Sequence, residues 1–185
     1  MTSPRQVSGT ILAISGSLRR NSINRAVLRA AAAAAARDGT LVVVDDSVRG
    51  LPHFDPDLEV EPPEAVQRFR AAWDEATGVL LAVPEYTFEI PGSFKNALDW
   101  TVGSGSLYRK RSPSSTSPRP AAARAREALD LVLKAHGAEA ARYPMPLARN
   151  DRNAAGEVDD PRIIGELRAV VAGLAKRGTA TDPAG

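Results

Sequence analysis

The sequence predicts an α/β domain in which a parallel sheet lies between helices, and three observations support this fold class. Short apolar runs within 10–15, 40–45 and 79–83 lack the alternation of a half-exposed strand, which indicates strands buried on both faces. Segments with helical spacing of apolar residues separate these runs. The strand–helix–strand spacing implies right-handed crossovers, as expected of parallel strands.

Composition sets the outer limits of this prediction. The chain has 185 residues, of which 43% are hydrophobic and 25% charged, so we expect one domain over 1–185 with an ordered core over 10–177. It contains no cysteine, which excludes a disulfide framework, thiol chemistry and a cysteine-ligated metal, and favours the reducing cytoplasm. We expect no membrane partner, since the start lacks the layout of a secretion signal and no apolar run is long enough to span a bilayer.

The net charge of +2 does not indicate a nucleic-acid-binding protein. Basic residues are interspersed with acids, and no stripe of aromatic and basic residues accompanies them. We therefore expect no nucleic-acid partner.

The first strand, Thr10 to Ser15, leads through the loop GSLRRNSIN into an alanine-rich helix over 25–38. A loop between a strand and a helix N-terminus offers unpaired backbone donors and the positive end of the helix dipole. Ser17, Ser22, Asn24 and Arg19 add donors that suit a phosphate. The loop is neither a Walker A motif nor GxGxxG, so a single phosphate fits better than a triphosphate or a dinucleotide. In the alternative interpretation, Ser22 only caps the helix and the arginines are solvated.

The next segments extend the α/β pattern. A second strand is predicted over 40–45, followed by a proline-rich loop over 46–62 in which His53 is interpreted as an ordinary loop residue. A helix then starts at Pro63 and Glu64, because proline and an acid suit the first turn.

The central stretch of the chain runs from Gly78 to Trp100. The strand over 79–83 ends at Pro84, and a helix restarts after Pro91 with Ser93 as the predicted N-cap. The intervening loop follows the carboxyl end of a parallel strand, where ligands bind in open sheets. Glu85, Tyr86 and Thr87 are therefore predicted to face a ligand crevice.

The second half of the chain is less regular. Helices are predicted over 121–136, with Gly137 as a left-handed stop, and over 160–176, with a short strand over 138–143 between them. Residues 109–120 should supply another strand, but they contain three prolines and no apolar residue. Such a segment is not expected to form a buried central strand, and its composition predicts a loop or disorder.

Two motifs, GSLRRNSIN and PEYTFEIPGSFKNALDW, resemble the NADPH-dependent FMN reductase family, which includes chromate-, quinone- and azo-reducing flavoproteins. The resemblance runs from about Ile11 to Ala138. It implies a flavodoxin-like three-layer fold with a five-stranded parallel sheet in the order 2-1-3-4-5, whose fourth strand is doubtful at 109–120. It also implies bound FMN and a homodimer or homotetramer.

The resemblance also implies a site. The residues at the family's phosphate-binding positions are Ser17, Arg19, Ser22 and Asn24. Those in the loop that borders the isoalloxazine ring, mainly through backbone groups, are Pro84, Glu85, Tyr86 and Thr87. Thr87 stands where the family usually has asparagine. Lys95 and Asp99 are spaced for a plain surface ion pair, so no catalytic side chain and no metal ligand is assigned.

The implied function is an FMN-dependent NAD(P)H oxidoreductase that reduces quinones, flavins, azo compounds or oxidised metals by ping-pong hydride transfer. NADPH or NADH would be the donor, and the partner a small-molecule electron acceptor. The alternative is a non-enzymic flavodoxin-like electron carrier, or a flavin-binding domain with impaired activity. Flavodoxins normally present an acidic surface, so the net positive charge of this chain favours the enzyme.

Two explanations of residues 109–120 remain open. The family has an apolar strand here, and both flanking segments stay in register with it. A double frameshift in the coding sequence would replace such a strand by the serine- and proline-rich segment. The other explanation is a genuine basic loop.

Overall fold

The computed structural model describes residues 9–108, 114–116, 123–138, 141–142 and 151–177. Five parallel strands form one sheet in the order β2-β1-β3-β4-β5, which confirms the predicted order. The strands are β1 (Thr10–Ser15), β2 (Leu41–Asp45), β3 (Gly78–Ala82), β4 (Ser114–Thr116) and β5 (Ala141–Arg142).

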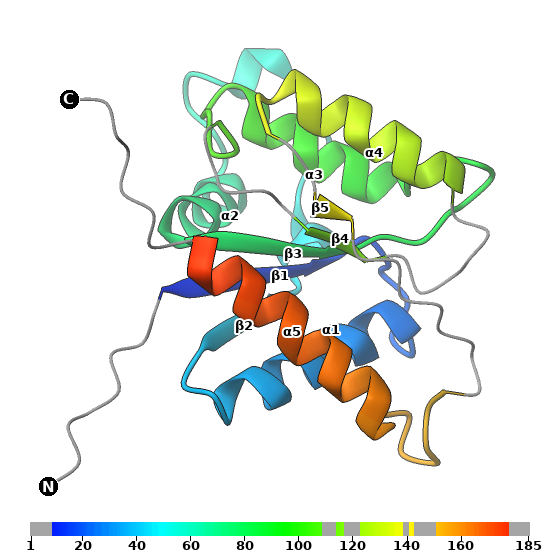
Figure 1. Cartoon of the computed structure of the whole chain (residues 1–185). Helices are drawn as coiled ribbons and strands as arrows, with labels where there is room; N and C mark the ends of the chain where they lie inside the picture. The colour runs from blue at the N-terminus through cyan, green and yellow to red at the C-terminus, as the bar shows by residue number, and fades with distance from the viewer. Residues whose placement is uncertain (1–8, 109–113, 117–122, 139–140, 143–150, 178–185) are drawn as a thin grey trace, which may run out of the picture.

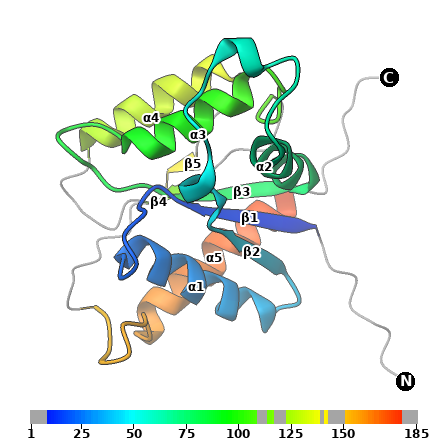
Figure 2. The ribbon, with the colours of Figure 1, turned by 180° about the vertical axis from the view of Figure 1, so that it is seen from behind.

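The helices cover both faces of the sheet, so the three-layer architecture is confirmed (Figure 1). On one face lie α1 (Ile23–Ala36) and α5 (Pro161–Arg177). On the other lie α2 (Glu64–Glu75), α3 (Gly92–Val102) and α4 (Ala123–Ala135), as the view from behind also shows (Figure 2).

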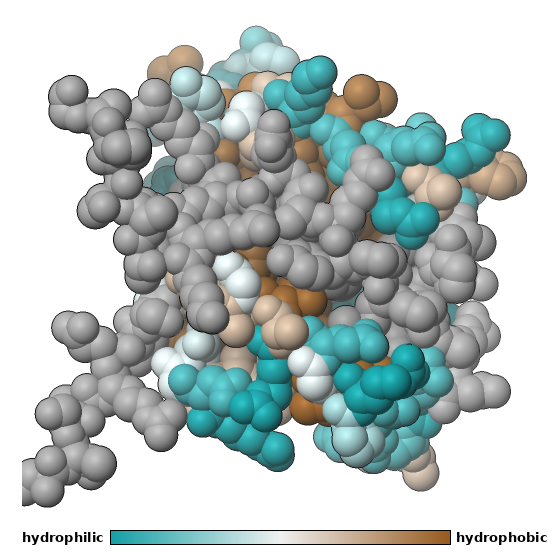
Figure 3. Space-filling model, viewed as in Figure 1, coloured by the Kyte–Doolittle hydropathy of each residue, from teal (hydrophilic) through white to brown (hydrophobic). Residues whose placement is uncertain are grey.

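The two central strands are buried on both sides. Alternate residues of a strand point to opposite faces, so β1 contributes Ile11 and Ala13 to the core beneath α1 and α5, and Leu12 and Ile14 to the core beneath α2, α3 and α4. Every residue of β3 is buried. This explains why neither strand shows a polar–apolar alternation in the sequence. In the space-filling view, hydrophilic residues gather at the bottom of the molecule, around α5 and the loop before it, with apolar residues visible between them (Figure 3).

Residues 114–116 form a strand, so the expectation that 109–120 would supply none is wrong. Ser114 to Thr116 pair in parallel with Leu80 to Ala82 of β3, and Ser114 and Ser115 pair with β5. Hydrogen bonds between strands are made by backbone amide and carbonyl groups. On the side of β3 away from β1, these groups are buried and need partners, which β4 supplies. Serine and threonine supply these backbone groups as well as valine does. The remaining residues of 109–120 lie outside the described part of the chain.

The helix boundaries agree with the predictions to within a few residues, with one correction at a cap. Ser22 caps α1, because its Oγ accepts a hydrogen bond from the backbone amide of Asn24 at 3.2 Å. Ser93, in contrast, lies inside α3 and is not its N-cap. Pro91 occupies that position, and its carbonyl accepts from Phe94 N and Lys95 N at 2.9 Å each. Gly137 has a φ of +69° just beyond α4, as predicted for a left-handed stop.

The proline-rich loop after β2 contains two short 3-10 helices, Ser47–Gly50 and Pro56–Leu58. It is anchored to α3, since Asn96 Nδ2 and Trp100 Nε1 donate to the carbonyl of Pro52 at 2.8 and 2.9 Å. Asn96 Oδ1 accepts from Phe54 N at 2.7 Å. His53 is exposed, in agreement with an ordinary loop residue.

Among the described helices, none has the length and apolar character that a membrane crossing requires.

Candidate functional site

The loops after β1 and β3 meet at the carboxyl edge of the sheet. Ser15 and Ala82, the last residues of the two strands, are paired in register. The amide of Gly16 donates to the carbonyl of Ala82 at 2.9 Å. A Cβ atom at residue 16 would lie 3.2 Å from Pro84 Cδ and 3.2 Å from Val83 Cγ1. The backbones of the two loops are therefore in close contact, and glycine is the residue that permits it.

The first loop carries the predicted phosphate-binding residues. Ser17, Ser22 and Asn24 are buried at 4%, 6% and 3% exposure, whereas Arg19 is exposed. Ser17 N donates to Ser15 Oγ at 3.1 Å, and Arg19 N to Ser17 Oγ at 3.4 Å. Serine side chains thus brace the backbone of the loop from inside. The capping role of Ser22 is confirmed, and its phosphate role stays a prediction.

The start of α1 suits an anion. The first amides of a helix have no intrahelical partner, and the aligned peptide dipoles make this end positive. Asn24 Oδ1 is buried, and among the described residues it has no hydrogen-bond partner. This oxygen is an acceptor, as phosphate oxygens are, so within the Asn24 amide only Nδ2 could donate to a phosphate. The support for a phosphate ester here comes from donors: the start of α1, the serine hydroxyls and Asn24 Nδ2.

The second loop contains a strained turn. Tyr86 N donates to Glu89 O at 2.9 Å, and Glu89 N donates to Tyr86 O at 3.1 Å. The two residues between them, Thr87 and Phe88, have φ values of +53° and +66°. They are the only residues other than glycine with positive φ among those the structure describes. Positive φ at both central positions is the type I′ arrangement, which favours glycine and asparagine.

The two predicted groups of residues touch each other. Ser17 Oγ and the hydroxyl of Tyr86 are 3.1 Å apart, which is a hydrogen-bond distance between residues 69 positions apart in the sequence. Tyr86 is 49% exposed, so about half of its side chain is open to solvent at this edge of the sheet. Pro84 is buried against Gly16, and Thr87 is exposed at the tip of the turn.

The N-terminus of α4 contacts the loop after β3. Glu85 Oε2 accepts from Ala125 N at 3.0 Å, and the guanidinium of Arg124 lies 5.5 Å from the centre of the Phe88 ring. The resemblance implies that this loop acts mainly through backbone groups, and the structure shows in addition a contact of the Glu85 side chain with α4. No local sequence pattern indicates this contact, because 40 positions separate the two residues.

Two arginines that the sequence did not single out brace the first loop. Arg49, in the 3-10 helix after β2, donates to the carbonyl of Leu18. Arg152, before α5, donates to the carbonyl of Asn21 at 3.0 Å.

Lys95 and Asp99 form the predicted ion pair on α3. Among the described residues, no group of three or more histidines and acids is arranged to hold a metal ion.

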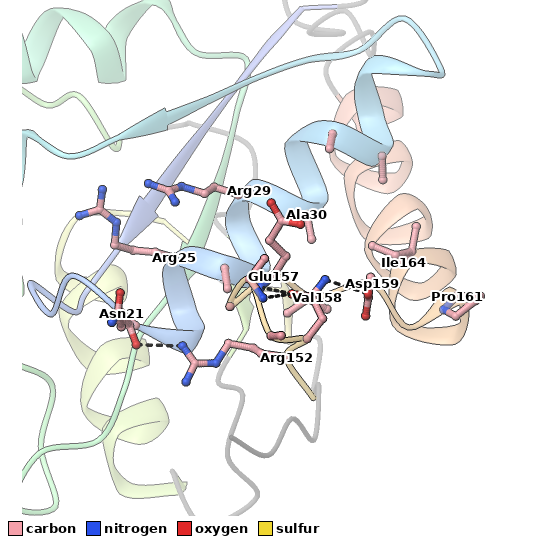
Figure 4. Close-up of a pocket in the computed structure, with 18 of the residues that line it drawn as sticks. Asn21, Arg25, Arg29, Ala30, Arg152, Glu157, Val158, Asp159, Pro161 and Ile164 are labelled. Carbon is pink, nitrogen blue, oxygen red and sulfur yellow. Dashed lines mark hydrogen bonds between the residues drawn. The ribbon is translucent and has the colours of Figure 1, made fainter. Parts of the chain in front are cut away.

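A pocket of about 1040 Å³ lies along α1, facing the loop over 152–159 and the start of α5 (Figure 4). Figure 4 shows Arg152 bonded to Asn21 at one end and Ile164 of α5 at the other. Of the predicted site residues, only Ser22 lines it. Arg20, Asn21 and Ser22 of the β1 loop line the pocket, so it adjoins that loop, whereas no residue of the β3 loop lines it.

Comparisons with solved structures agree with the fold. The flavoenzyme FerB, an NAD(P)H:(acceptor) oxidoreductase from Paracoccus denitrificans, superposes with a TM-score of 0.74 at 26% identity, covering 92% of this chain and 97% of that one. A flavodoxin, WrbA-like protein from Agrobacterium tumefaciens superposes with a TM-score of 0.53 at 14% identity, over 91% of this chain and 96% of that one. The flavodoxin-like fold is thus confirmed.

Comparisons with curated proteins give relatives at higher identity. The chain is 42% identical over 102 residues to a probable NADPH:quinone oxidoreductase 2 of Oryza sativa subsp. japonica, covering 54% of this chain and 49% of the relative. It is 39% identical over 90 residues to a 2-hydroxy-1,4-benzoquinone reductase of Burkholderia sp, covering 49% and 48%. The chain thus spans about half the length of these relatives. The model of the NADPH-dependent FMN reductase family matches residues 10–146, which include both loops of the site, and the chain therefore belongs to this family.

Proposed function

We propose that the chain binds FMN in the crevice between the β1 and β3 loops and acts as an NAD(P)H-dependent oxidoreductase on small-molecule acceptors, quinones among them. The observation that carries the proposal is the 3.1 Å contact between Ser17 Oγ and the Tyr86 hydroxyl. It brings the residues at the family's phosphate positions next to those at its ring positions. Two groups predicted for opposite ends of one ligand thus adjoin at the carboxyl edge of the sheet.

The residues present suit FMN. The hydroxyls of Ser17 and Ser22, the amide of Asn24, the guanidinium of Arg19 and the start of α1 would hold the phosphate. Backbone groups of Pro84 to Thr87 would border the isoalloxazine ring. Thr87 in place of asparagine leaves such backbone bonding intact.

The chemistry of the reaction would come from the flavin, which accepts hydride from a nicotinamide and passes electrons on. The protein would bind the flavin, orient the substrates against it and exclude competing reactions, and no side-chain acid or base is required. Tyr86 and Phe88 are 49% and 66% exposed on the turn beside the crevice, which leaves apolar surface for planar substrates. The names of the curated relatives support quinones as acceptors. NADPH or NADH would serve as the donor.

We further propose that the chain assembles as a homodimer or homotetramer in the cytoplasm. Val102, Tyr108 and Leu131, in and near α3 and α4, are 55%, 62% and 71% exposed. Val102 and Tyr108 line the same hollow beside the end of α4, and exposed apolar side chains that lie together support an association surface.

Flavin binding to the purified chain tests the proposal. FMN should bind with a visible absorbance spectrum characteristic of a flavoprotein, and more tightly than riboflavin. Because Arg19 would make a charged hydrogen bond to the phosphate, Arg19→Ala should weaken FMN roughly 10- to 100-fold and leave riboflavin unchanged. Arg20→Ala removes a neighbouring exposed arginine and serves as the control.

Two results would contradict the proposal. Equal affinity for FMN and riboflavin would exclude the phosphate assignment. A flavin-loaded protein that does not oxidise NADPH or NADH with a simple benzoquinone would exclude the enzymatic activity and favour an electron carrier.

A further inference from the structure

We infer that Glu85 is a positioning residue whose carboxylate fixes the turn over 86–89 by binding the N-terminus of α4. The position of α4 would then set the shape of the loop that borders the flavin. The consequence for the cofactor rests on the proposed function, but the consequence for the turn does not.

The contact has the features of a helix cap supplied from another part of the chain. Ala125 is the third residue of α4, so its amide has no partner within the helix. It donates to Glu85 Oε2 at 3.0 Å, and Ala125 itself is 2% exposed. The first turn of α4 contains no acidic residue of its own. Glu85 therefore supplies the negative charge that favours this end of the helix dipole.

A second contact holds the other side of the same turn. The Arg124 guanidinium lies 5.5 Å from the centre of the Phe88 ring, within the range of a cation–π interaction. Arg124 and Ala125 are adjacent, and Glu85 and Phe88 flank Tyr86 and Thr87. The first turn of α4 thus contacts the β3 loop twice, through Ala125 and through Arg124.

The turn needs such support because its backbone is strained. Thr87 and Phe88 have positive φ, a conformation that persists only where surrounding contacts determine it. The paired bonds between Tyr86 and Glu89 close the turn but do not tie it to the rest of the protein. Without the Glu85 carboxylate, the turn can relax, and the Tyr86 hydroxyl can leave Ser17.

The test compares the loss of this cap with the loss of an unrelated one. Asp160 caps α5 on the opposite face of the sheet, where its Oδ1 accepts from Arg162 N at 2.8 Å. Glu85→Ala and Asp160→Ala each remove one carboxylate from a helix N-terminus, so both should lower the melting temperature. Only Glu85→Ala should speed hydrogen exchange of the amides over 85–90. Glu85→Gln, whose amide oxygen can still accept from Ala125 N, should restore most of the protection.

The same variants are titrated with FMN. We expect Glu85→Ala to weaken FMN at least roughly tenfold, which corresponds to the loss of one charged hydrogen bond, and Asp160→Ala to leave it unchanged. Exchange over 85–90 that is no faster in Glu85→Ala than in Asp160→Ala would overturn the positioning role. Faster exchange with unchanged FMN affinity would overturn its link to the cofactor. If the unaltered chain binds no FMN, the proposed function fails, and the exchange measurement still decides the role of Glu85.

Discussion

Replacing Thr87 by asparagine should stabilise the protein, although no contact is added. Thr87 has a φ of +53° and a β-branched side chain, which is among the least suitable for this conformation. A residue held in such a region costs about 1–3 kcal/mol, and asparagine tolerates it far better. Thr87 is exposed at the tip of the turn, so little packing is lost. We therefore expect a gain of about 1 kcal/mol in the free energy of unfolding, which for a domain of this size corresponds to roughly 2–4 °C in Tm.

Urea unfolding followed by circular dichroism measures this gain as a shift in the midpoint at constant slope. Val60→Asn is the matched control, since Val60 is also β-branched, is 97% exposed and does not have positive φ. Val60→Asn should change stability by less than about 0.5 kcal/mol, as surface substitutions usually do. A Thr87→Asn midpoint at or below that of Val60→Asn would refute the argument from backbone strain.

Three further predictions concern the reaction and the sheet. Initial rates with NADPH and a quinone should give parallel double-reciprocal lines, because donor and acceptor would use one flavin face in turn; intersecting lines would indicate a ternary complex. Tyr86→Ala should slow flavin reduction markedly and lower Tm only slightly, because Tyr86 is 49% exposed and outside the core; loss of the melting transition with an intact flavin spectrum would show that Tyr86 serves folding instead. Replacing Ser114–Thr116 by three valines should raise both Tm and FMN affinity, because valine suits a strand with neighbours on both sides; no change in either would argue against the importance of an apolar strand here.

The sequence alone predicts those elements whose local pattern of apolar residues reflects their position in the fold. All three apolar runs became strands, but burial on both faces of the sheet holds only for β1 and β3. The predicted burial of the second strand on both faces is wrong, because β2 lies at the edge of the sheet and its Leu41 and Val43 are 50% and 42% exposed. The meeting of the loops after β1 and β3 was predictable as well, since parallel strands bring their following loops to one edge. Ser17 and Tyr86 were assigned to the same ligand from their motifs, and the structure places their hydroxyls in contact.

The sequence was insufficient where backbone groups or distant residues decide the outcome. The strand at Ser114–Thr116 is held by backbone pairing with its neighbours, which side-chain hydropathy does not report. The start of α3 depends on the carbonyl of Pro91, so the prediction of Ser93 as its cap is wrong. The contact of Glu85 with α4 joins segments whose relation only the folded chain reveals.

The absence of a side chain at Gly16 has a consequence for engineering. A Cβ atom there would lie 3.2 Å from Pro84 Cδ and from Val83 Cγ1, so one of these neighbours would have to move by a few tenths of an ångström. The residues that meet between the loop after β1 and the loop after β3 therefore have to match in size. A graft that transfers the β3 loop of a relative to alter acceptor preference should carry the β1 loop with it. Grafted alone, the new loop would meet a surface shaped for a different partner.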